Sequence, residues 1–301
     1  MSAFSGPLVA TLSRYASSWS AQVPPHSYAL LRIVLGAVGL LSLAGLTPVS
    51  MFWDLAGLSP LSSDGVGPRA WLYIHGWGGV VGWAFFVGLA LALAAVSVGY
   101  RTGPAVLASF IGLVAQPHWN HLPLSSAHAV LIVLFFCLLW AEPGRVWSLD
   151  AKRSPSKDGL VPVWPLMLMR YQIALIYWSS ALWKISFPEW RDGSVIYWVL
   201  SLNGFHRFPG ELPLGLAPVL ALMTWGTLGF EFAFPFLVFA RRTRLAALVC
   251  GVALHLGLWA TLELGPFSLV MIGSYLAFLN PQSVSKLGSD AAAPTLRSLV
   301  G

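Results

Sequence analysis

Lys184 is the residue whose position points most clearly to chemistry. It ends a long apolar and aromatic segment, WPLMLMRYQIALIYWSSALWK. An ammonium group is costly at membrane depth, so an ionisable side chain there marks a functional site by default. The alternative is that Lys184 extends its ammonium toward the outer headgroups and only anchors a helix.

Tyr177 and Ser180 share a helical face with Lys184. They precede it by seven and four residues, spacings that place all three side chains on roughly one side of a helix. The segment therefore carries a polar stripe within an aromatic wall. We expect Tyr177 and Ser180 to contact a substrate.

Three more charged residues fall within apolar runs: Arg32, Arg170 and Glu231. Counting along the chain places them at a similar depth. A lone buried charge is costly, whereas a carboxylate that faces a guanidinium group is tolerated. We therefore predict that Glu231 pairs with Arg32 or Arg170 as a structural ion pair between helices. A catalytic role for these groups is the alternative.

Several histidines gather on the expected outer side of the membrane. His128 begins one apolar run and His255 lies within another, while His75 and His206 fall in two aromatic loops. These loops could roof a cavity, so His75 and His206 are predicted substrate contacts. No two histidines have the i, i+4 spacing of a helical metal site, and no metal is predicted. The sequence also lacks a Gly-rich phosphate loop and a Gly-x-Ser-x-Gly elbow.

The composition sets these residues in a membrane. With 57% hydrophobic and 9% charged residues, the chain of 301 residues lacks the polar surface of a soluble domain. Membrane lipid is therefore a predicted partner. The net charge of +6 comes from positive residues scattered over short loops, which argues against a nucleic-acid partner.

The apolar runs predict an all-α fold, a polytopic transmembrane helical bundle with about eight spans. The expected spans are residues 27–46, 78–98, 102–116, 125–141, 165–186, 214–239, 244–262 and 266–279. An amphipathic segment, residues 1–26, is expected to precede the transmembrane domain at 27–281, and residues 282–301 are expected to form a C-terminal tail.

Positive residues in the loops predict the orientation. If both termini are cytoplasmic, the outer loops hold only Arg69, Arg191 and Arg207, in agreement with the positive-inside rule. Lys184 and His128 then lie toward the outer face. We therefore expect a multi-pass integral membrane protein with its site near the extracytoplasmic face.

Four stretches of the sequence resemble a known family. RYQIALIYWSSALWKISFPEWRDG, LLRIVLG, WSLD and GFEFAFPFLVFARRTRLAALVCGVALHLGLW are similar to segments of the HTTM family, which contains the membrane domain of vitamin K-dependent gamma-carboxylase. The resemblance covers about residues 27–281. It implies that Lys184 is the base that deprotonates a reduced vitamin K, with Trp190 downstream as expected at the substrate site. It also implies that His128 assists Lys184, and that His255 matches the family's histidine after the basic RRTR turn.

The implied activity starts with a vitamin K-like hydroquinone that enters from the bilayer. Its anion would react with O2 without a metal to give an epoxide, or an alkoxide that abstracts a carbon-bound proton. The activity is then either a hydroquinone oxygenase or epoxidase alone, or one coupled to carboxylation with CO2 of a small or separately presented substrate, such as a peptide. Carboxylation of a protein is less expected, because the carboxylase's large soluble domain has no counterpart in this sequence. The alternatives are a non-enzymatic maturation or immunity factor resembling the sporulation-delaying export system and, third, a transporter.

Overall fold

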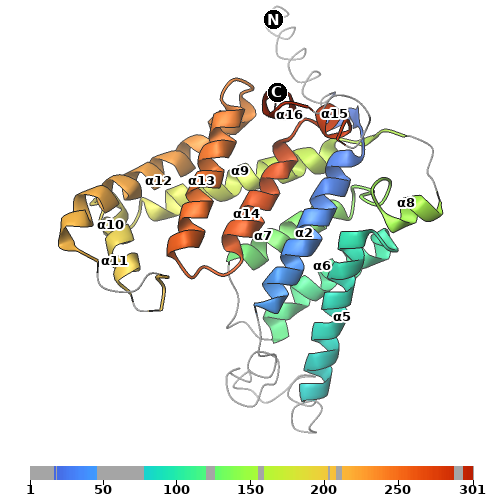
Figure 1. Ribbon diagram of the computed structural model, residues 1–301, viewed down its shortest axis with the longest axis horizontal. Coiled ribbons are helices and arrows are strands. Elements are labelled where there is room, and N and C mark those ends of the chain that lie inside the picture. The colour runs from blue at the N-terminus through green and yellow to red at the C-terminus, as the bar shows by residue number, and fades with distance from the viewer. Residues whose placement is uncertain are drawn as a thin grey trace, which may run out of the picture.

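The computed structural model describes residue 17 and residues 19–45, 78–119, 126–154, 159–202, 204–207, 212–287 and 294–300, and is mostly helical (Figure 1). The longer helices are α2 (His26–Ala44), α5 (Gly78–Val98), α6 (Thr102–Trp119), α7 (Ser126–Leu138), α9 (Trp164–Lys184), α12 (Ala217–Phe239) and α13 (Arg244–Thr261). The shorter helices are α8 (Leu149–Arg153), α10 (Pro188–Arg191), α11 (Val195–Ser201), α14 (Phe267–Ser274), α15 (Pro281–Val284) and α16 (Leu296–Val300). Two 3-10 turns, η1 (Leu214–Leu216) and η2 (Tyr275–Phe278), adjoin α12 and α14.

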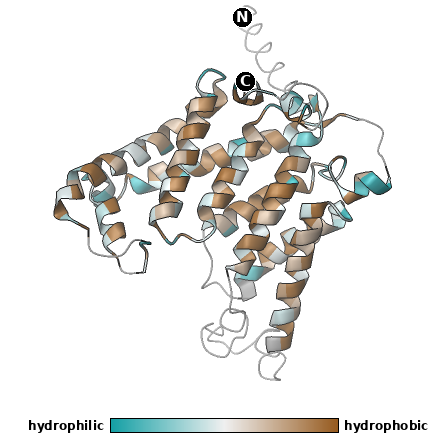
Figure 2. Ribbon diagram, viewed as in Figure 1, coloured by the Kyte–Doolittle hydropathy of each residue, from teal (hydrophilic) through white to brown (hydrophobic). Residues whose placement is uncertain are grey.

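Every apolar run that we expected to span the membrane contains a helix, with ends that differ by a few residues. In the described part of the chain, four helices are long and apolar enough to cross a membrane: His26–Ala44, Val80–Val98, Leu214–Phe239 and Arg244–Thr261. The apolar helices α6, α7 and the continuous α14–η2 segment are shorter. Figure 2 shows hydrophobic residues along most helices and hydrophilic ones on α8 and the turn between α12 and α13. These features indicate an integral membrane protein.

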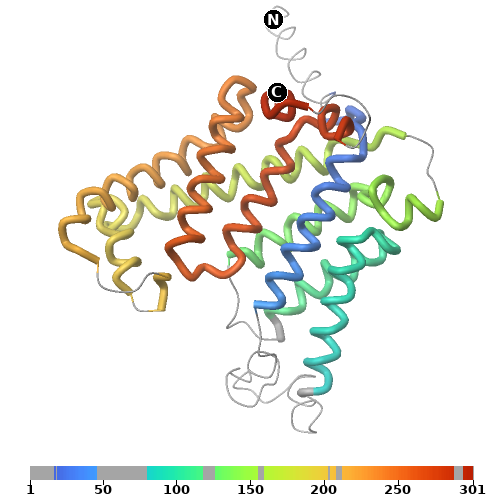
Figure 3. The backbone as a smooth tube through the Cα atoms, in the orientation of Figure 1, coloured from blue at the N-terminus to red at the C-terminus, as the bar shows by residue number. Residues whose placement is uncertain are grey.

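Helices α13, α14 and α2 lie side by side across the bundle, and α9 crosses behind them (Figure 3). Helix α9 packs against α12 along an aromatic seam. The rings of Trp178 and Phe232 lie 4.5 Å apart between centroids, and those of Tyr171 and Phe239 lie 4.9 Å apart. The two helices are therefore antiparallel, with the last turn of α9 beside the middle of α12. The first half of α12 packs instead on α10 and α11, where the Trp225 indole donates to the Arg191 carbonyl at 3.1 Å.

Arg32 is fully buried, and its partners are backbone carbonyls. Its Nη1 donates to the Val96 and Ser97 carbonyls at 2.6 and 2.9 Å, and its Nη2 donates to the Trp147 carbonyl at 2.6 Å. Carbonyls in the last turn of a helix have no donor within that helix, so the end of α5 can satisfy a guanidinium group. The predicted pairing of Arg32 with Glu231 is therefore wrong.

The turn after α5 requires a glycine at position 99, because the Arg32 side chain passes beside it. Gly99 has φ +72°, and a Cβ there would lie 2.3 Å from the Ser148 Cβ and 2.5 Å from the Arg32 Nη1. A side chain would be strained by the backbone conformation and would also collide with both neighbours. Helices α2 and α5 also lie close together at Gly36, where a Cβ would lie 2.4 Å from the Ser97 hydroxyl oxygen.

Arg170 also finds its partners at a helix end. Its Nε donates to the Ala277 carbonyl at 2.6 Å and its Nη2 to the Leu279 carbonyl at 3.0 Å, which joins α9 to η2. The predicted pairing of Arg170 with Glu231 is therefore also wrong. The reason is the same, since carbonyls at the end of a short helical segment replace the carboxylate.

The ends of the described chain are tied to the bundle. Strands β1 (Gln22–Val23) and β2 (Val161–Pro162) form an antiparallel pair. Most of the predicted amphipathic segment, residues 1–26, lies outside the described residues. In the predicted tail, the Val300 carbonyl accepts from Arg244 at 2.8 Å, which holds α16 against the start of α13.

The WSLD stretch caps two helices, α8 and α6. Ser148 caps α8 by accepting from the Ala151 amide at 2.9 Å. Asp150 accepts from the amides of Arg101 and Thr102 and from the Thr102 hydroxyl, at 2.7 to 2.8 Å, and so caps α6. Burial raises the pKa of Asp150, but these hydrogen bonds lower it by more, so the pKa lies below its ordinary value. The motif therefore joins α6 to α8 through one ionised carboxylate.

We expect Asp150→Asn to lower the free energy of unfolding by about 1 kcal/mol at neutral pH, because the substitution removes the charge that caps α6. A depressed carboxyl pKa contributes stability that is present above the unfolded pKa, about 3.9, and is lost as pH falls through the folded pKa. The difference between wild type and variant should therefore shrink below about pH 4. Thermal unfolding in detergent across pH measures it, and a difference independent of pH would contradict the capping role.

Candidate functional site

A cavity of about 720 Å³ opens among the helices and collects several of the predicted site residues. Its walls come from α2, α5, α6, α7, α9 and the turn before α14. Most of the lining is apolar, and the polar groups are few. The lining residues are Gly39, Ser42, Leu43, Gly45, Leu89, Leu93, Leu113, Gln116, Ser126, Ala127, His128, Leu131, Ser180, Lys184, Glu263, Leu264, Gly265, Pro266 and Phe267.

Lys184 lies on this cavity wall, and its ammonium forms an ion pair with the Glu231 carboxylate. The Lys184 side chain is 22% exposed and that of Glu231 is 9% exposed. The ammonium also lies over the ring of Trp190, 4.7 Å from its centroid. A carboxylate attracts an ammonium group electrostatically, and so does the face of an aromatic ring. The Lys184 side chain is thus an ammonium held on two sides.

Glu231 pairs with Lys184 because of the register between α9 and α12. Counting along the chain predicts that Glu231 lies at the depth of Arg32 and Arg170, away from Lys184. This prediction takes α9 and α12 to match over their full lengths. Instead the first half of α12 extends past α9 onto α10 and α11, which brings Glu231 to the last turn of α9.

The second carboxylate oxygen of Glu231 is distinctive. Oε2 is buried and has no hydrogen-bond partner among the described residues. The backbone carbonyl of Glu231 also lacks its usual helical donor, because Pro235, four residues later in α12, has no amide hydrogen. Glu231 is therefore an acidic side chain with one engaged and one unengaged oxygen.

His128 reaches the same cavity from the start of α7. Its Nε2 lies 2.7 Å from the Leu113 carbonyl, and because a carbonyl only accepts, Nε2 donates. The Leu113 carbonyl is available because Pro117, inside α6, cannot supply the usual helical amide. In the neutral imidazole the other nitrogen, Nδ1, is then an acceptor. One proline thus fixes the orientation of His128.

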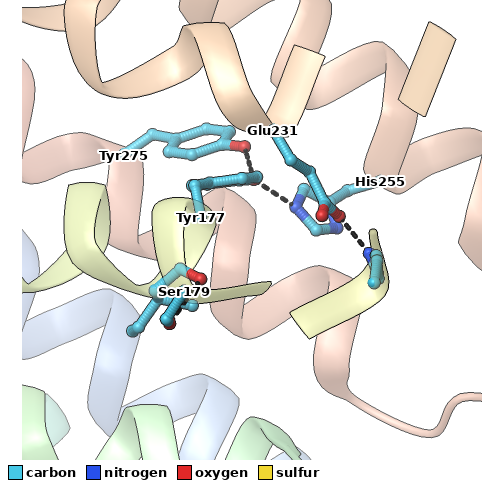
Figure 4. Close-up of polar contacts among 7 residues, drawn as sticks. Tyr177, Ser179, Glu231, His255 and Tyr275 are labelled. Carbon is cyan, nitrogen blue, oxygen red and sulfur yellow. Dashed lines mark hydrogen bonds and ion pairs between the residues drawn. The ribbon is translucent and has the colours of Figure 1, made fainter. Parts of the chain in front are cut away.

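A second polar group lies behind the cavity wall. The Tyr177 hydroxyl contacts the His255 Nε2 at 2.7 Å and is also hydrogen-bonded to the Tyr275 hydroxyl, as the dashed lines in Figure 4 show. All three residues are buried, and the Nδ1 of His255 has no hydrogen-bond partner among the described residues. The ring of His255 packs against Phe267, which does line the cavity, with centroids 5.5 Å apart.

Glycine makes room for this network. A Cβ at Gly251 would lie 2.3 Å from the Tyr275 hydroxyl oxygen. Gly251 belongs to α13, one turn before His255, so the bare backbone lets Tyr275 approach Tyr177. Neither Tyr275 nor Gly251 was predicted, because nothing in the spacing of the sequence connects them to Lys184.

The remaining predicted site residues divide into three groups. Ser180 lines the cavity with Lys184 and His128. Tyr177 and Trp190 are not among the residues that line it, although Trp190 contacts the ammonium. The backbone of His206 pairs with Leu262 next to the cavity's turn, and His75 lies outside the described residues. In the part of the chain that the structure describes, no three His, Cys, Asp or Glu side chains gather as a metal site would require.

Comparison with known proteins identifies one domain. The model of the HTTM domain matches residues 21–282. No solved structure matches the chain.

Two proteins of Bacillus subtilis (strain 168) are similar to part of the chain. One is the uncharacterized protein YitO, 28% identical over 165 residues, which are 52% of this chain and 52% of YitO. The other is the sporulation-delaying protein SdpB, 27% identical over 141 residues, which are 45% of this chain and 44% of SdpB. The matched region thus spans about half the length of each relative.

We expect Gly251→Ala to destabilise the protein by about 1–3 kcal/mol, because the added methyl group displaces the Tyr275 hydroxyl. Gly257→Ala on the same helix is the control, since a Cβ there meets no atom within 4 Å. That control should be neutral or stabilising by up to about 1 kcal/mol. Thermal unfolding in detergent compares the two. Adding Tyr275→Phe should recover part of the Gly251→Ala loss, and equal effects at both glycines would contradict the crowding argument.

Proposed function

The chain belongs to the HTTM family, the family of the vitamin K-dependent carboxylase membrane domain, and on that premise we propose that it is a membrane enzyme that deprotonates a hydroquinone for oxygen-dependent epoxidation. The observation that carries the proposal is that Lys184, Ser180 and His128, from helices α9 and α7, line one cavity. A lysine that merely anchored a helix would have no need of a shared cavity with a fixed histidine.

The cavity suits a flat, apolar substrate with a few polar atoms. Ligand pockets for molecules of drug size occupy about 300–1,000 Å³, are mostly apolar and place a few polar groups to fix orientation. This cavity has that volume and lining. A naphthohydroquinone presents two hydroxyl groups on an apolar ring system, which matches a wall of leucine side chains with Lys184, Ser180 and His128 among them.

The reaction balances without a metal. A hydroquinone and O2 give a quinone epoxide and water, so the two hydroxyl hydrogens leave as water and one oxygen atom enters the ring system. Lys184, once it has lost its own proton, takes up the first hydroxyl proton, and His128 Nδ1, oriented by the Leu113 carbonyl, is the acceptor available for a second. Coupling to carboxylation with CO2 of a small or peptide substrate belongs to the same proposal.

The membrane arrangement that goes with this function has eight spans with both termini cytoplasmic. The turn between α12 and α13, with Arg241 and Arg242, lies near α15 and α16 at the top of Figure 1, whereas α11 lies at the opposite end. Such a separation of positive residues follows the positive-inside rule. It would place the Lys184 end of α9 toward the extracytoplasmic face, where a quinol could enter from the outer leaflet.

A second candidate function comes from the relative named sporulation-delaying protein SdpB. On this alternative the chain is a non-enzymatic factor for maturation of, or immunity to, another protein, and the Lys184–Glu231 pair joins α9 to α12. The two functions differ in whether the cavity turns over a quinol. A transporter remains a third alternative, with less support because the shared Lys184–His128 cavity favours proton chemistry.

Lys184→Ala should lower quinone epoxide formation by a hundredfold or more, about the contribution of a positioned base. Purified protein in detergent receives a reduced naphthoquinone under O2, and mass spectrometry follows the epoxide. Lys152→Ala, on α8 and away from the cavity, is the matched control and should retain full activity. Well-folded wild type that gives no epoxide from several quinols would favour the non-enzymatic function.

His128→Phe should lower the same activity by about tenfold to a hundredfold while leaving Lys184 in place. Phenylalanine keeps a flat aromatic ring but has no nitrogen to face the substrate. Because it leaves the Leu113 carbonyl without a donor, unfolding is measured in parallel. An unchanged rate in a folded variant would remove His128 from the proposed mechanism.

A further inference from the structure

We propose that Glu231 receives the proton that Lys184 must lose, so that the two side chains act together as one base. The inference rests on the proposed function and names the residue that makes its first step possible. Sequence reasoning had assigned Glu231 to a structural ion pair with an arginine. The structure pairs it instead with Lys184, a lysine on the cavity wall.

The resting state of Lys184 creates the need for such a partner. An ammonium has no lone pair and cannot take a proton from a hydroxyl group. The Glu231 carboxylate and the Trp190 ring, whose centroid lies 4.7 Å from Nζ, both stabilise that ammonium. Lys184 therefore has to give up a proton before it can act, and an acceptor must be within hydrogen-bond distance.

Glu231 is the acceptor that the geometry offers. It is hydrogen-bonded to Nζ through Oε1, so the proton moves along an existing contact. Its other oxygen, Oε2, is buried without a partner among the described residues, so the carboxylate is only half engaged. Oε2 is therefore an oxygen on which the proton could reside without displacing an existing hydrogen bond.

The other titratable groups around this pair make their hydrogen bonds or ion pairs with other partners. The Tyr177 hydroxyl on α9 is shared between His255 on α13 and Tyr275 on η2. His128 on α7 donates to the Leu113 carbonyl, and Glu263 on the turn pairs with Arg207 at 2.9 Å. Within the described residues, Glu231 is the acid that touches Lys184.

The proton transfer takes place in two steps. First an N–H bond of Lys184 breaks and an O–H bond forms on Glu231, which converts the ion pair into a neutral amine and a neutral acid. Then the substrate O–H bond breaks and the amine becomes an ammonium again. The products are an ammonium, a protonated Glu231 and a substrate anion, so the total charge is unchanged and no oxidant is consumed.

The pH dependence of substrate ionisation tests this pairing. Reduced naphthoquinone is added without oxygen, and the absorbance of its anion reports deprotonation. In wild type the pair is ready once Glu231 is ionised, whereas Glu231→Gln requires Lys184 to lose its proton to water. The acid limb of the profile should therefore move to higher pH by about one unit or more in Glu231→Gln, with the signal restored at alkaline pH. Glu231→Asp should keep the limb near that of wild type.

A purely structural Glu231 gives a different result. In that case Glu231→Gln lowers the signal at every pH in proportion to the folded protein and leaves the limb in place, which overturns the proposal. Glu189→Gln is the matched control, because Glu189 is an exposed glutamate on α10 near the same helix end. It should change neither the amplitude nor the limb.

Labelling of Lys184 with an amine-selective reagent separates this inference from the proposed function, because it needs no quinol. Mass spectrometry follows the labelling rate against pH, with Lys152 as the internal reference. In Glu231→Gln the Lys184 amine has lost its carboxylate partner, so its labelling should begin at lower pH than in wild type. If Glu231→Gln does not fold, Glu231→Asp takes its place, and the shift in the labelling profile should be smaller. An unshifted profile refutes the pairing. A shifted profile in a protein that ionises no quinol supports the pairing and refutes the quinol instead.

Discussion

Desolvation of charge is the constraint on which this bundle depends. Each buried cation must find its partners inside the protein, because lipid offers none. Arg32 and Arg170 solve this with carbonyls at the ends of α5 and η2, and thereby fix how α2, α5, α8 and α9 meet. Lys184 solves it differently, with the Glu231 carboxylate. A carbonyl cannot take up a proton at working pH but a carboxylate can, so the cation on the cavity wall is the one whose partner can change its charge.

The positions of the helices could be predicted because apolar runs of helical length are bounded by Pro, Gly and charged residues. That Lys184 and His128 lie near each other could also be predicted, because both fall on one expected side of the membrane. In the structure both line the same cavity. The partner of Glu231 could not be predicted. Pairing between helices depends on register, and residue counting treats every helix as starting at the same depth. The overhang of α12 beyond α9, which decides the pair, leaves no trace in either segment alone.

Two prolines show how local sequence shapes the site at a distance. Pro117 and Pro235 each lie four residues after a residue of interest, Leu113 and Glu231. Each withholds the amide that would complete a helical hydrogen bond. The Leu113 carbonyl, which lacks a helical donor, accepts from His128 instead, so a missing amide on α6 orients a side chain on α7. A proline within an apolar run predicts such a vacancy, but the side chain that fills it depends on tertiary packing.

Part of the cavity wall formed by the described residues is not helical. The turn from Glu263 to Phe267 joins α13 to α14. Two backbone hydrogen bonds hold its start to another loop: the Glu263 amide donates to the Phe205 carbonyl at 2.7 Å, and the Arg207 amide donates to the Thr261 carbonyl at 3.0 Å. Gly265 in this turn has φ +56° and open space around it. Insertions in this turn would leave the hydrogen bonds within α7, α9 and α12 intact, because the turn lies outside those helices. The breadth of substrates admitted could therefore be redesigned by exchanging this turn, while the proton-transfer groups on α7, α9 and α12 stay as they are.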